Sequence, residues 1–243
     1  MSFRLTQMTT VRIFRGCMSK IFVFISISSA LVSFILLTGC RSNVCTPHTE
    51  DPMGAAYRHV LTHWQSAEQG ESRRGYNIAA VLVSPEGKIL AKELNSVIAL
   101  QDCTQHAEMR LIQRYLAEHR CFNLRGCSVY TTLEPCAMCT ATMGMAGIDH
   151  VYYGQSDPAF GKAAERLSQD TTPQGGYPPY PRVVHCELLG SPLQRELEEA
   201  FRRSGVKEIT KWLATDEAKS IFLKYLTDSN HQHFRASENT ALQ

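Results

Sequence analysis

The chain has 243 residues, of which 44% are hydrophobic and 20% are charged, values that are typical of a globular protein and exclude a disordered one. The formal net charge is +2, but the charged residues are unevenly distributed along the chain. Residues 1–39 contain four basic residues and no acidic one, and the rest of the chain has 21 basic and 23 acidic side chains. A protein that binds nucleic acid usually has a basic surplus. The net charge therefore gives no support for a nucleic-acid partner, although it does not exclude a local basic patch.

An uncharged apolar segment, residues 21–37, follows the basic residues and precedes Thr38-Gly39-Cys40. This order is typical of a secretory signal peptide, and Leu37-Thr38-Gly39-Cys40 resembles a bacterial lipobox, in which the cysteine becomes the lipidated N-terminus. We expect residues 1–39 to be a lipoprotein-type signal peptide and Cys40 to be the lipidation site. The protein would then be exported and anchored to a membrane, on the periplasmic side or the cell surface. An uncleaved anchor or a plain secretory signal is the alternative.

Strands and helices alternate along the rest of the chain. Apolar, β-branched runs separated by turn residues predict strands, and helical spacing of apolar residues predicts helices. The predicted strands cover residues 76–83, 89–94, 128–133, 150–154 and 182–188. The predicted helices cover residues 53–69, 105–119, 135–146, 192–203 and a segment from about 216. This order favours an α/β layered sheet.

Cap residues mark the ends of several of these helices. Thr104 stands at the expected N-cap of the helix over 105–119, and Pro135 is the expected first residue of the next helix. Gly147 and Gly205 follow two helices as expected C-caps, and Ser191 precedes the helix over 192–203. Residues 40–53 are polar and are predicted to be a tether before the folded part.

Two short motifs carry the residue types of a catalytic metal site: His106-Ala107-Glu108, and Pro135-Cys136-Ala137-Met138-Cys139. Zinc prefers nitrogen and thiolate ligands in a tetrahedral arrangement, and a catalytic site leaves one position for water. Two cysteines three residues apart on the first turn of a helix can face one point, where the helix dipole favours thiolates. His106 would be the third ligand, and Glu108 would lie beside the metal as a general acid and base.

This joint pattern is the signature of the zinc deaminases. Residues from about Gly75 to Arg203 resemble the cytidine deaminase-like superfamily, and most closely its bacterial tRNA adenosine deaminase branch. The resemblance rests on the two motifs and on three other segments, which are Ala80-Val81-Leu82-Val83 with Asn95, Tyr130-Thr131-Thr132-Leu133-Glu134, and Tyr153-Gly154-Gln155-Ser156-Asp157 through Gly161.

The resemblance implies a three-layer α/β/α sandwich with a five-stranded mixed sheet, a bound Zn²⁺, and a substrate site that includes Asn95 and Ala107. It also suggests a possible homodimer. The implied organisation is a signal peptide over 1–39, a tether over 40–53, a zinc-dependent deaminase domain over 54–204 and a helical C-terminal extension over 205–243. Residues from Gly205 onward have no counterpart in the resemblance.

The expected reaction is hydrolytic deamination of a nucleobase, nucleoside or nucleotide with release of ammonia, a purine such as adenosine or guanine being favoured over cytosine. Glu108 would move the protons, and His106, Cys136 and Cys139 would hold the zinc. The alternatives are a non-catalytic, zinc-stabilised binding module and an exported deaminase toxin that acts on nucleic acid. A structural zinc site is a further alternative, because Cys103 and His106 together with the two cysteines could supply four ligands and exclude water.

Other conspicuous residues have simpler interpretations. His59 and His63 are four residues apart on a predicted helix, but they lack the glutamate of a metalloprotease motif and are expected to be surface or packing residues. Cys121, Cys127 and Cys186 are expected to be small buried side chains, although in an oxidising compartment some of them could form disulfides. Phe160 and the cluster from Tyr177 to Tyr180 are expected to pack in the core or within loops, with substrate stacking as the alternative.

Overall fold

Five strands form one mixed sheet in the part of the chain that the computed structural model describes, residues 51–228. The described residues belong to one compact unit. The predicted signal peptide, Cys40 and most of the predicted tether lie outside the described residues. Within the described range, no helix is long and apolar enough to cross a membrane.

The strand order in the sheet is β2-β1-β3-β4-β5. β1 is antiparallel to both of its neighbours, with Ala80 opposite Thr131 in β3. The central strand β3 and its neighbours β4 and β5 are parallel, with Val129 opposite Val151. The strands are β1 (Ala79–Val83), β2 (Ile89–Leu94), β3 (Ser128–Thr131), β4 (His150–Tyr153) and β5 (His185–Leu188). All five predicted strands are therefore present, although all except β2 are shorter than predicted.

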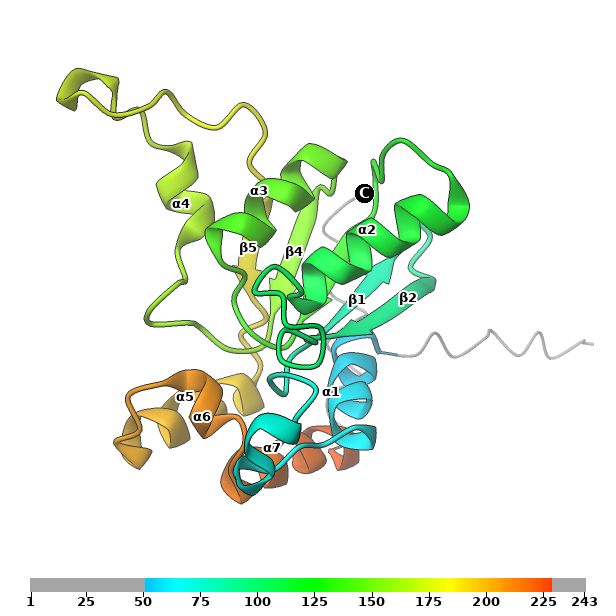
Figure 1. The fold of residues 1–243 in the computed structure, drawn as a ribbon, viewed down its shortest axis with the longest axis vertical. Coiled ribbons are helices and arrows are strands. Elements are labelled where there is room, and N and C mark those ends of the chain that lie inside the picture. The colour runs from blue at the N-terminus through cyan, green and yellow to red at the C-terminus, as the bar shows by residue number, and fades with distance from the viewer. Residues whose placement is uncertain (1–50, 229–243) are drawn as a thin grey trace, which may run out of the picture. The chain divides into compact units, whose positions relative to one another are not determined.

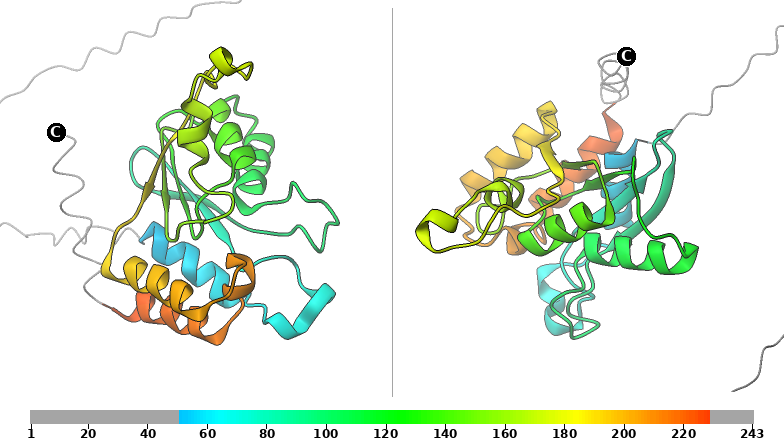
Figure 2. Two further views of the ribbon diagram at one scale, coloured as in Figure 1. Left: turned by 90° about the vertical axis from the view of Figure 1, so that its left-hand side faces the viewer. Right: turned by 90° about the horizontal axis from the view of Figure 1, so that it is seen from above.

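Helices cover both faces of this sheet, which gives the predicted three-layer α/β/α sandwich (Figures 1 and 2). On one face, α1 packs on β1, β2 and β3, and α7 packs on α1 and α5. On the other face, α2 packs on the same three strands and contacts α3. The helices are α1 (Pro52–Thr62), α2 (Ala107–His119), α3 (Ala137–Ala146), α4 (Ala163–Ser168), α5 (Pro192–Ser204), α6 (Ile209–Trp212) and α7 (Asp216–Thr227), with short 3-10 helices at Ala67–Ser72 and Thr172–Gln174.

The first helix differs from the prediction at both ends. It begins at Pro52, because the Asp51 carboxylate accepts a 3.0 Å hydrogen bond from the amide of Gly54 as an N-cap, and Met53 is fully buried. The end of the predicted tether over 40–53 is thus wrong. The helix stops at Thr62 rather than at residue 69, and the chain that follows is held by Asn77, which exchanges two hydrogen bonds with the backbone of Gln65.

The helices after residue 205 pack into the same hydrophobic core as the sheet. Trp212 and Phe222 are fully buried, and the Asn77 side-chain amide donates a 3.1 Å hydrogen bond to the carbonyl of Leu213. At the end of α7, the Tyr225 hydroxyl donates to the Asp51 carboxylate at 3.0 Å. The segment that follows Gly205 is therefore helical, as predicted, and as far as Thr227 it closes the core around α1.

Candidate active site

The two predicted metal-binding motifs meet at the N-termini of α2 and α3. His106 is the N-cap residue of α2, Cys136 is the N-cap residue of α3, and Cys139 lies on the first turn of α3. The predicted helix starts at Thr104 and Pro135 were wrong by two residues each, because Thr104 bonds to the Asp102 carboxylate and Cys136 has an extended backbone. The three ligand atoms, His106 Nδ1 and the two Sγ atoms, lie within 4.8 Å of one another.

The spacing of these three atoms fits a tetrahedral zinc ion. The two Sγ atoms are 3.6 Å apart, and His106 Nδ1 lies 3.7 Å from Cys136 Sγ and 3.6 Å from Cys139 Sγ. Tetrahedral coordination with Zn–S of about 2.3 Å and Zn–N of about 2.0 Å requires ligand separations of roughly 3.5–3.8 Å. The donor set therefore has the chemistry and the geometry that zinc requires.

The pKa values of the two thiols also favour the binding of a cation. The pKa of Cys136 is lowered to about 4, first by the hydrogen bond from the Cys139 thiol and then by His106. The pKa of Cys139 is raised well above its usual value, because this thiol donates to Cys136 and is buried beside Glu108. The pair thus shares one proton, which a divalent cation would displace on binding.

Glu108 lies beside this cluster and is not a member of it. Its Oε2 is 3.6 Å from Cys139 Sγ, and its Oε1 accepts a 2.6 Å hydrogen bond from the Thr131 hydroxyl. Only 3% of Glu108 is exposed, and this burial raises the pKa of its carboxyl group. A buried carboxyl group whose pKa is raised can both accept and return a proton, which is the role predicted for Glu108.

A pocket of about 710 Å³ opens onto the cluster. His106, Glu108 and Cys136 line it, together with Tyr76, Ile78, Asn95, Val97, Cys103, Leu133, Glu134, Pro135, Asp157, Pro158, Ala159, Phe160, Lys207, Glu208, Ile209 and Thr210. A volume of this size falls within the range of about 300–1,000 Å³ that is usual for small-molecule sites. The pocket therefore gives a substrate access to the metal-binding residues.

Of the two predicted substrate-binding residues, Asn95 lines the pocket and Ala107 does not. Asn95 lines the pocket and is almost fully buried, and its Oδ1 accepts hydrogen bonds from the amides of Tyr76 (3.1 Å) and Val97 (3.4 Å). These bonds fix the amide plane of the side chain. Ala107 is fully buried and does not line the pocket, although both of its neighbours do. The role of Asn95 suits its position, and the role of Ala107 stays a prediction from the resemblance.

The alternative four-ligand site lacks its fourth ligand among the described residues. Cys103 is exposed and lines the same pocket, but it does not lie within the cluster of His106, Cys136 and Cys139. The rings of His59, on α1, and His63, its C-cap residue, lie 5.0 Å apart, and neither belongs to the cluster. Cys127 is buried, Cys121 and Cys186 are half-buried, and all six described cysteines are free thiols.

Two aromatic predictions need correction. Phe160 was expected to pack in the core or a loop, but 67% of it is exposed and it lines the pocket. Tyr177 is 84% exposed rather than packed. Phe160 is exposed because hydrogen bonds to Glu134 and Glu198 hold the loop between β4 and α4 in a position that leaves the ring outside the core.

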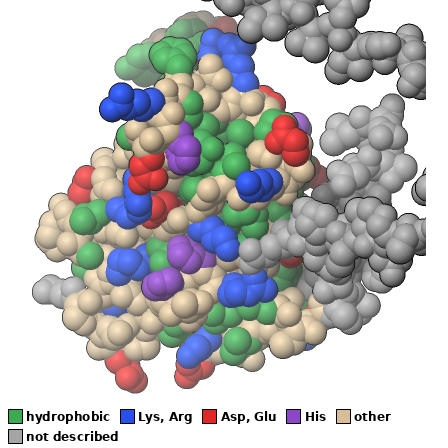
Figure 3. All heavy atoms as spheres, turned by 90° about the vertical axis from the view of Figure 1, so that its right-hand side faces the viewer, with side chains coloured by type: hydrophobic (Ala, Val, Ile, Leu, Met, Phe, Trp, Pro, Cys, Tyr) green, Lys and Arg blue, Asp and Glu red, His purple; other side chains and the backbone are tan. Residues whose placement is uncertain are grey.

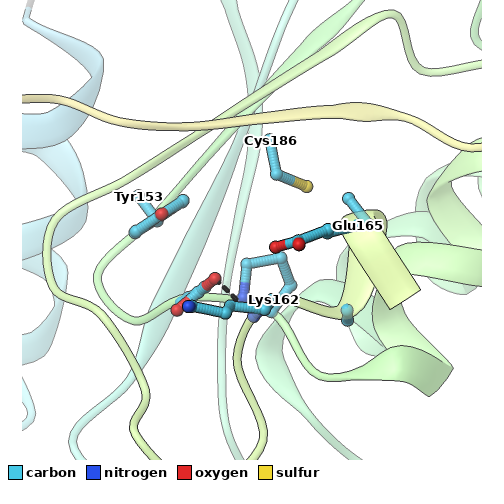
Figure 4. Close-up of a pocket in the computed structure, with 8 residues that line it drawn as sticks. Tyr153, Lys162, Glu165 and Cys186 are labelled. Carbon is cyan, nitrogen blue, oxygen red and sulfur yellow. Dashed lines mark hydrogen bonds between the residues drawn. The ribbon is translucent and has the colours of Figure 1, made fainter. Parts of the chain in front are cut away.

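A second, smaller cavity of about 260 Å³ lies behind Glu134 and Pro135, which line both cavities. Tyr153, Lys162, Glu165 and Cys186 surround it (Figure 4). Burial raises the pKa of Cys186 to about 12 and that of Tyr153 to about 12, so both groups are protonated at neutral pH. Neither the thiol of Cys186 nor the phenol of Tyr153 is therefore ionised in this cavity at neutral pH.

Basic side chains gather on the face that carries α1, β2 and α2 (Figure 3). Glu93 is the centre of this group and pairs with Arg110 at 3.1 Å and with Arg114. The pKa of His59 is lowered by burial and then by nearby cations, and that of Arg74 by burial and by Arg110. Glu93 interacts with His59, Arg74, Arg110 and Arg114, and His59 also interacts with His63 and Lys92. Glu93 and Glu118 offset part of this positive charge, so the group is a mixed cluster of basic side chains and carboxylates.

Sequence reasoning missed two parts of the site. One is Thr131, the last residue of β3, whose hydroxyl binds Glu108; its signal was a polar residue at the inward-facing end of a buried strand. The other is the pocket wall formed by residues 207–210, which comes from beyond the region of resemblance. A buried Ile209 directly after the exposed Lys207 and Glu208 was a weak signal for a segment that packs on the core.

Comparison with known proteins agrees with this site. The family model for the cytidine and deoxycytidylate deaminase zinc-binding region matches residues 55–155. The tRNA-specific adenosine deaminase of Agrobacterium fabrum is 40% identical over 125 residues, which are 51% of this chain and 80% of that enzyme. The tRNA-specific adenosine deaminase of Aquifex aeolicus is 38% identical over 84 residues, 35% of this chain and 55% of that enzyme.

Among solved structures, one described in a study of A-to-I editing by tRNA:A34 deaminases is 30% identical, with a TM-score of 0.43 and coverage of 54% of this chain and 95% of that one. The identity and coverage of the Agrobacterium enzyme decide the assignment. The chain therefore belongs to the cytidine deaminase-like superfamily, in the branch of the tRNA adenosine deaminases, and is a hydrolase of the zinc-type deaminase class.

Proposed function

We propose that this protein is a zinc-dependent deaminase that hydrolyses the exocyclic amino group of a purine base, with adenine favoured. The observation that carries the proposal is the arrangement of His106, Cys136 and Cys139 as three ligands at one corner of an open pocket, with Glu108 beside them. Three protein ligands leave the fourth position to water, as a catalytic zinc site requires. The preference for adenine is supported by the names of the relatives from Agrobacterium and Aquifex.

His106 Nδ1 and the sulfurs of Cys136 and Cys139 would hold the zinc. When bound, zinc lowers the pKa of water to about 7 and so supplies a nucleophile at neutral pH. Glu108 would accept a proton from the attacking water through Oε2 and deliver it to a ring nitrogen of the base. It would then take the proton of the newly added hydroxyl group and deliver it to the amino group, which leaves as ammonia. Thr131 holds the other oxygen of Glu108, so the carboxylate keeps one orientation throughout.

Asn95 positions the base in this scheme. Its Oδ1 is held by two backbone amides, and within the described residues no hydrogen bond occupies its side-chain nitrogen. This nitrogen can therefore donate to a ring nitrogen or a carbonyl oxygen of the base. Hydrogen bonds of this kind fix the orientation of a substrate in a mainly apolar pocket.

The test is ammonia release from a panel of free bases, nucleosides, nucleotides and RNA by the zinc-loaded protein that starts at Arg41. We expect turnover of an adenine-containing substrate, and we expect Glu108→Gln to abolish turnover while the zinc content stays at one ion per chain. Glu118→Gln, on the exposed end of α2, is the matched control and should retain full activity. A fully metallated protein that releases no ammonia from any member of the panel would overturn the proposal. In that case, ligand binding unchanged by Glu108→Gln would identify a binding module.

A further inference from the structure

Two histidines lie side by side on the sheet, at the end of the parallel strands opposite to Thr131. His150 is the first residue of β4 and His185 is the first residue of β5, and the register places them directly opposite each other. Side chains at such paired positions point to the same face of a sheet, from strands about 4.8 Å apart. Both histidines are exposed, whereas Val151, which points to the other face, is fully buried. The two imidazoles therefore face solvent together.

The distance between the two rings is that expected for two imidazoles on one zinc ion. Their centroids are 5.3 Å apart, and the ring planes make an angle of 76°. With Zn–N of about 2.0 Å, a ring centre about 1.1 Å behind the nitrogen and a tetrahedral angle of about 109°, the centroids of two zinc-bound imidazoles lie roughly 5.1 Å apart. The right angle of square-planar or octahedral coordination would bring them to roughly 4.4 Å. The observed spacing therefore favours tetrahedral zinc.

A carboxylate beside the pair favours a cation at this place. Glu187 lies on the same face of β5, and its Oε2 is 3.8 Å from Nε2 of His185. The side chains of His185 and Glu187 are 62% and 60% exposed, so small rotations can adjust both groups to an ion without displacing packed atoms. The pair thus has two nitrogen ligands of the type that zinc prefers and a negative charge close to them. Water would complete the coordination.

A second histidine pair on the surface has a similar spacing but a different charge environment. The rings of His59 and His63 are 5.0 Å apart. The pKa of His59 is lowered first by burial and then by His63, Lys92 and Arg74, and Glu93 opposes this effect only in part. The cations repel a metal ion at this pair, and His63 Nδ1 lies 3.1 Å from the carbonyl oxygen of His59. Spacing alone does not distinguish the two pairs, but the charges around them do.

The pair of His150 and His185 joins the edge strand to the rest of the sheet. β5 is the last strand in the order β2-β1-β3-β4-β5, has four residues, and pairs only with β4 among the described strands. The segment before it, residues 168–182, is exposed apart from the half-buried Tyr180, and it extends away from the sheet (Figure 1). An ion bound by one residue of each strand would add a cross-link at the start of this ladder. A ligand that binds only the folded chain stabilises it.

We propose that His150 and His185 form a second zinc site, in which one Zn²⁺ bridges β4 and the edge strand β5 and stabilises the fold. This inference does not rest on the proposed deaminase function, because the site shares no ligand with the three-ligand cluster at the N-termini of α2 and α3. It should bind zinc more weakly than that cluster, since it has two protein ligands and no thiolate. The second ion should therefore bind after the cluster is filled.

The experiment is a calorimetric titration of the zinc-free protein with Zn²⁺. We expect a tight site and a weaker site, and dialysis should remove the weaker ion and leave one ion per chain. His150→Ala and His185→Ala should each abolish the weaker site and keep the tight one, which also shows that the variants are folded. Glu187→Gln removes only the neighbouring charge and should weaken the second site by roughly 10- to 100-fold, the usual loss when a residue that supports a metal site is replaced.

Thermal unfolding is the second measurement. The midpoint for the protein with a filled cluster should continue to rise as Zn²⁺ is added beyond one equivalent, and in His150→Ala it should not. The double variant His59→Ala/His63→Ala removes the other histidine pair and is the matched control, which should change neither measurement. A titration with a single site, a weaker site that persists in both single variants, or a weaker site that is lost in the control would overturn the inference. These outcomes are independent of ammonia release, by which the deaminase proposal is tested.

Discussion

The hydroxyl of Thr131 donates a 2.6 Å hydrogen bond to Oε1 of Glu108, and both residues are almost fully buried. Thr131 ends the central strand β3, and Glu108 lies on the first turn of α2, so the bond joins the sheet to the helix that carries His106. Because Oε1 is occupied in this way, Oε2 is the oxygen that lies beside the metal ligands, 3.6 Å from Cys139 Sγ. The strand thus orients the carboxylate that we propose for proton transfer.

Replacing Thr131 with valine should impair catalysis without loss of the metal. Valine keeps the shape of the side chain but removes the donor to a buried carboxylate, which costs about 1–3 kcal/mol. If the whole cost falls on the transition state, kcat should drop by roughly 5- to 150-fold. Steady-state ammonia release and metal analysis would test this. Thr131→Ser keeps the hydroxyl and should lose much less activity; equal losses in the two variants would contradict the proposed orienting role.

The metal ligands and Cys103 should respond differently to substitution by serine. Cys136→Ser removes one of three ligands and should abolish stoichiometric zinc binding and activity. Cys103→Ser should leave both unchanged, because Cys103 lies outside the ligand cluster. Zinc content measured by mass spectrometry of the metal, together with ammonia release, distinguishes the two. Loss of zinc in Cys103→Ser would mean that the site is closed by a fourth protein ligand and is structural.

Local sequence patterns were sufficient to predict the sheet and the clustering of His106, Cys136 and Cys139. His106, Glu108, Cys136 and Cys139 were identified because ligands within one helical turn have a fixed spacing, and the strands because buried strands are short apolar runs. The helix starts were less certain: at Thr104 and Pro135 the best local cap or first residue is not used, since the chain bends two residues later to bring His106 and Cys136 together.

The pocket wall was beyond local reasoning. Phe160 and Lys207 lie 47 residues apart, and only the packing of α5 and α6 brings their segments to one pocket. An exposed phenylalanine cannot be distinguished from a core phenylalanine by composition, because its exposure depends on carboxylates elsewhere, such as Glu134 and Glu198, that hold the loop. Such long-range contacts have no signature in sequence spacing.

Trp212 should be essential to the stability of the described part of the chain. Its side chain is fully buried, and its ring lies 5.6 Å from that of Phe201. Trp212→Ala should lower the free energy of unfolding by about 3–5 kcal/mol, the usual cost of removing a large core aromatic side chain. Leu223→Ala, on the exposed side of α7 (48%), should cost no more than about 0.5 kcal/mol. Urea unfolding of both variants is the measurement, and a cost below about 1 kcal/mol for Trp212→Ala would show that the C-terminal helices are not part of the core.

Cys186 should resist alkylation in the folded protein, although it is not completely buried. Burial, followed by the nearby Glu134 carboxylate, raises the pKa of its thiol to about 12, so at pH 8 only on the order of one molecule in 10⁴ carries the reactive thiolate. Because the neutral thiol is the favoured form, the rate of labelling by iodoacetamide should rise about tenfold for each unit of pH between 7 and 9 and should stay far below the rate in urea. Peptide mapping by mass spectrometry measures each site separately, with the exposed Cys103 as the internal reference. Cys186 labelling as fast as that of Cys103 at pH 8 would contradict this prediction, and it would mean that the cavity behind Glu134 admits water freely enough to stabilise a thiolate.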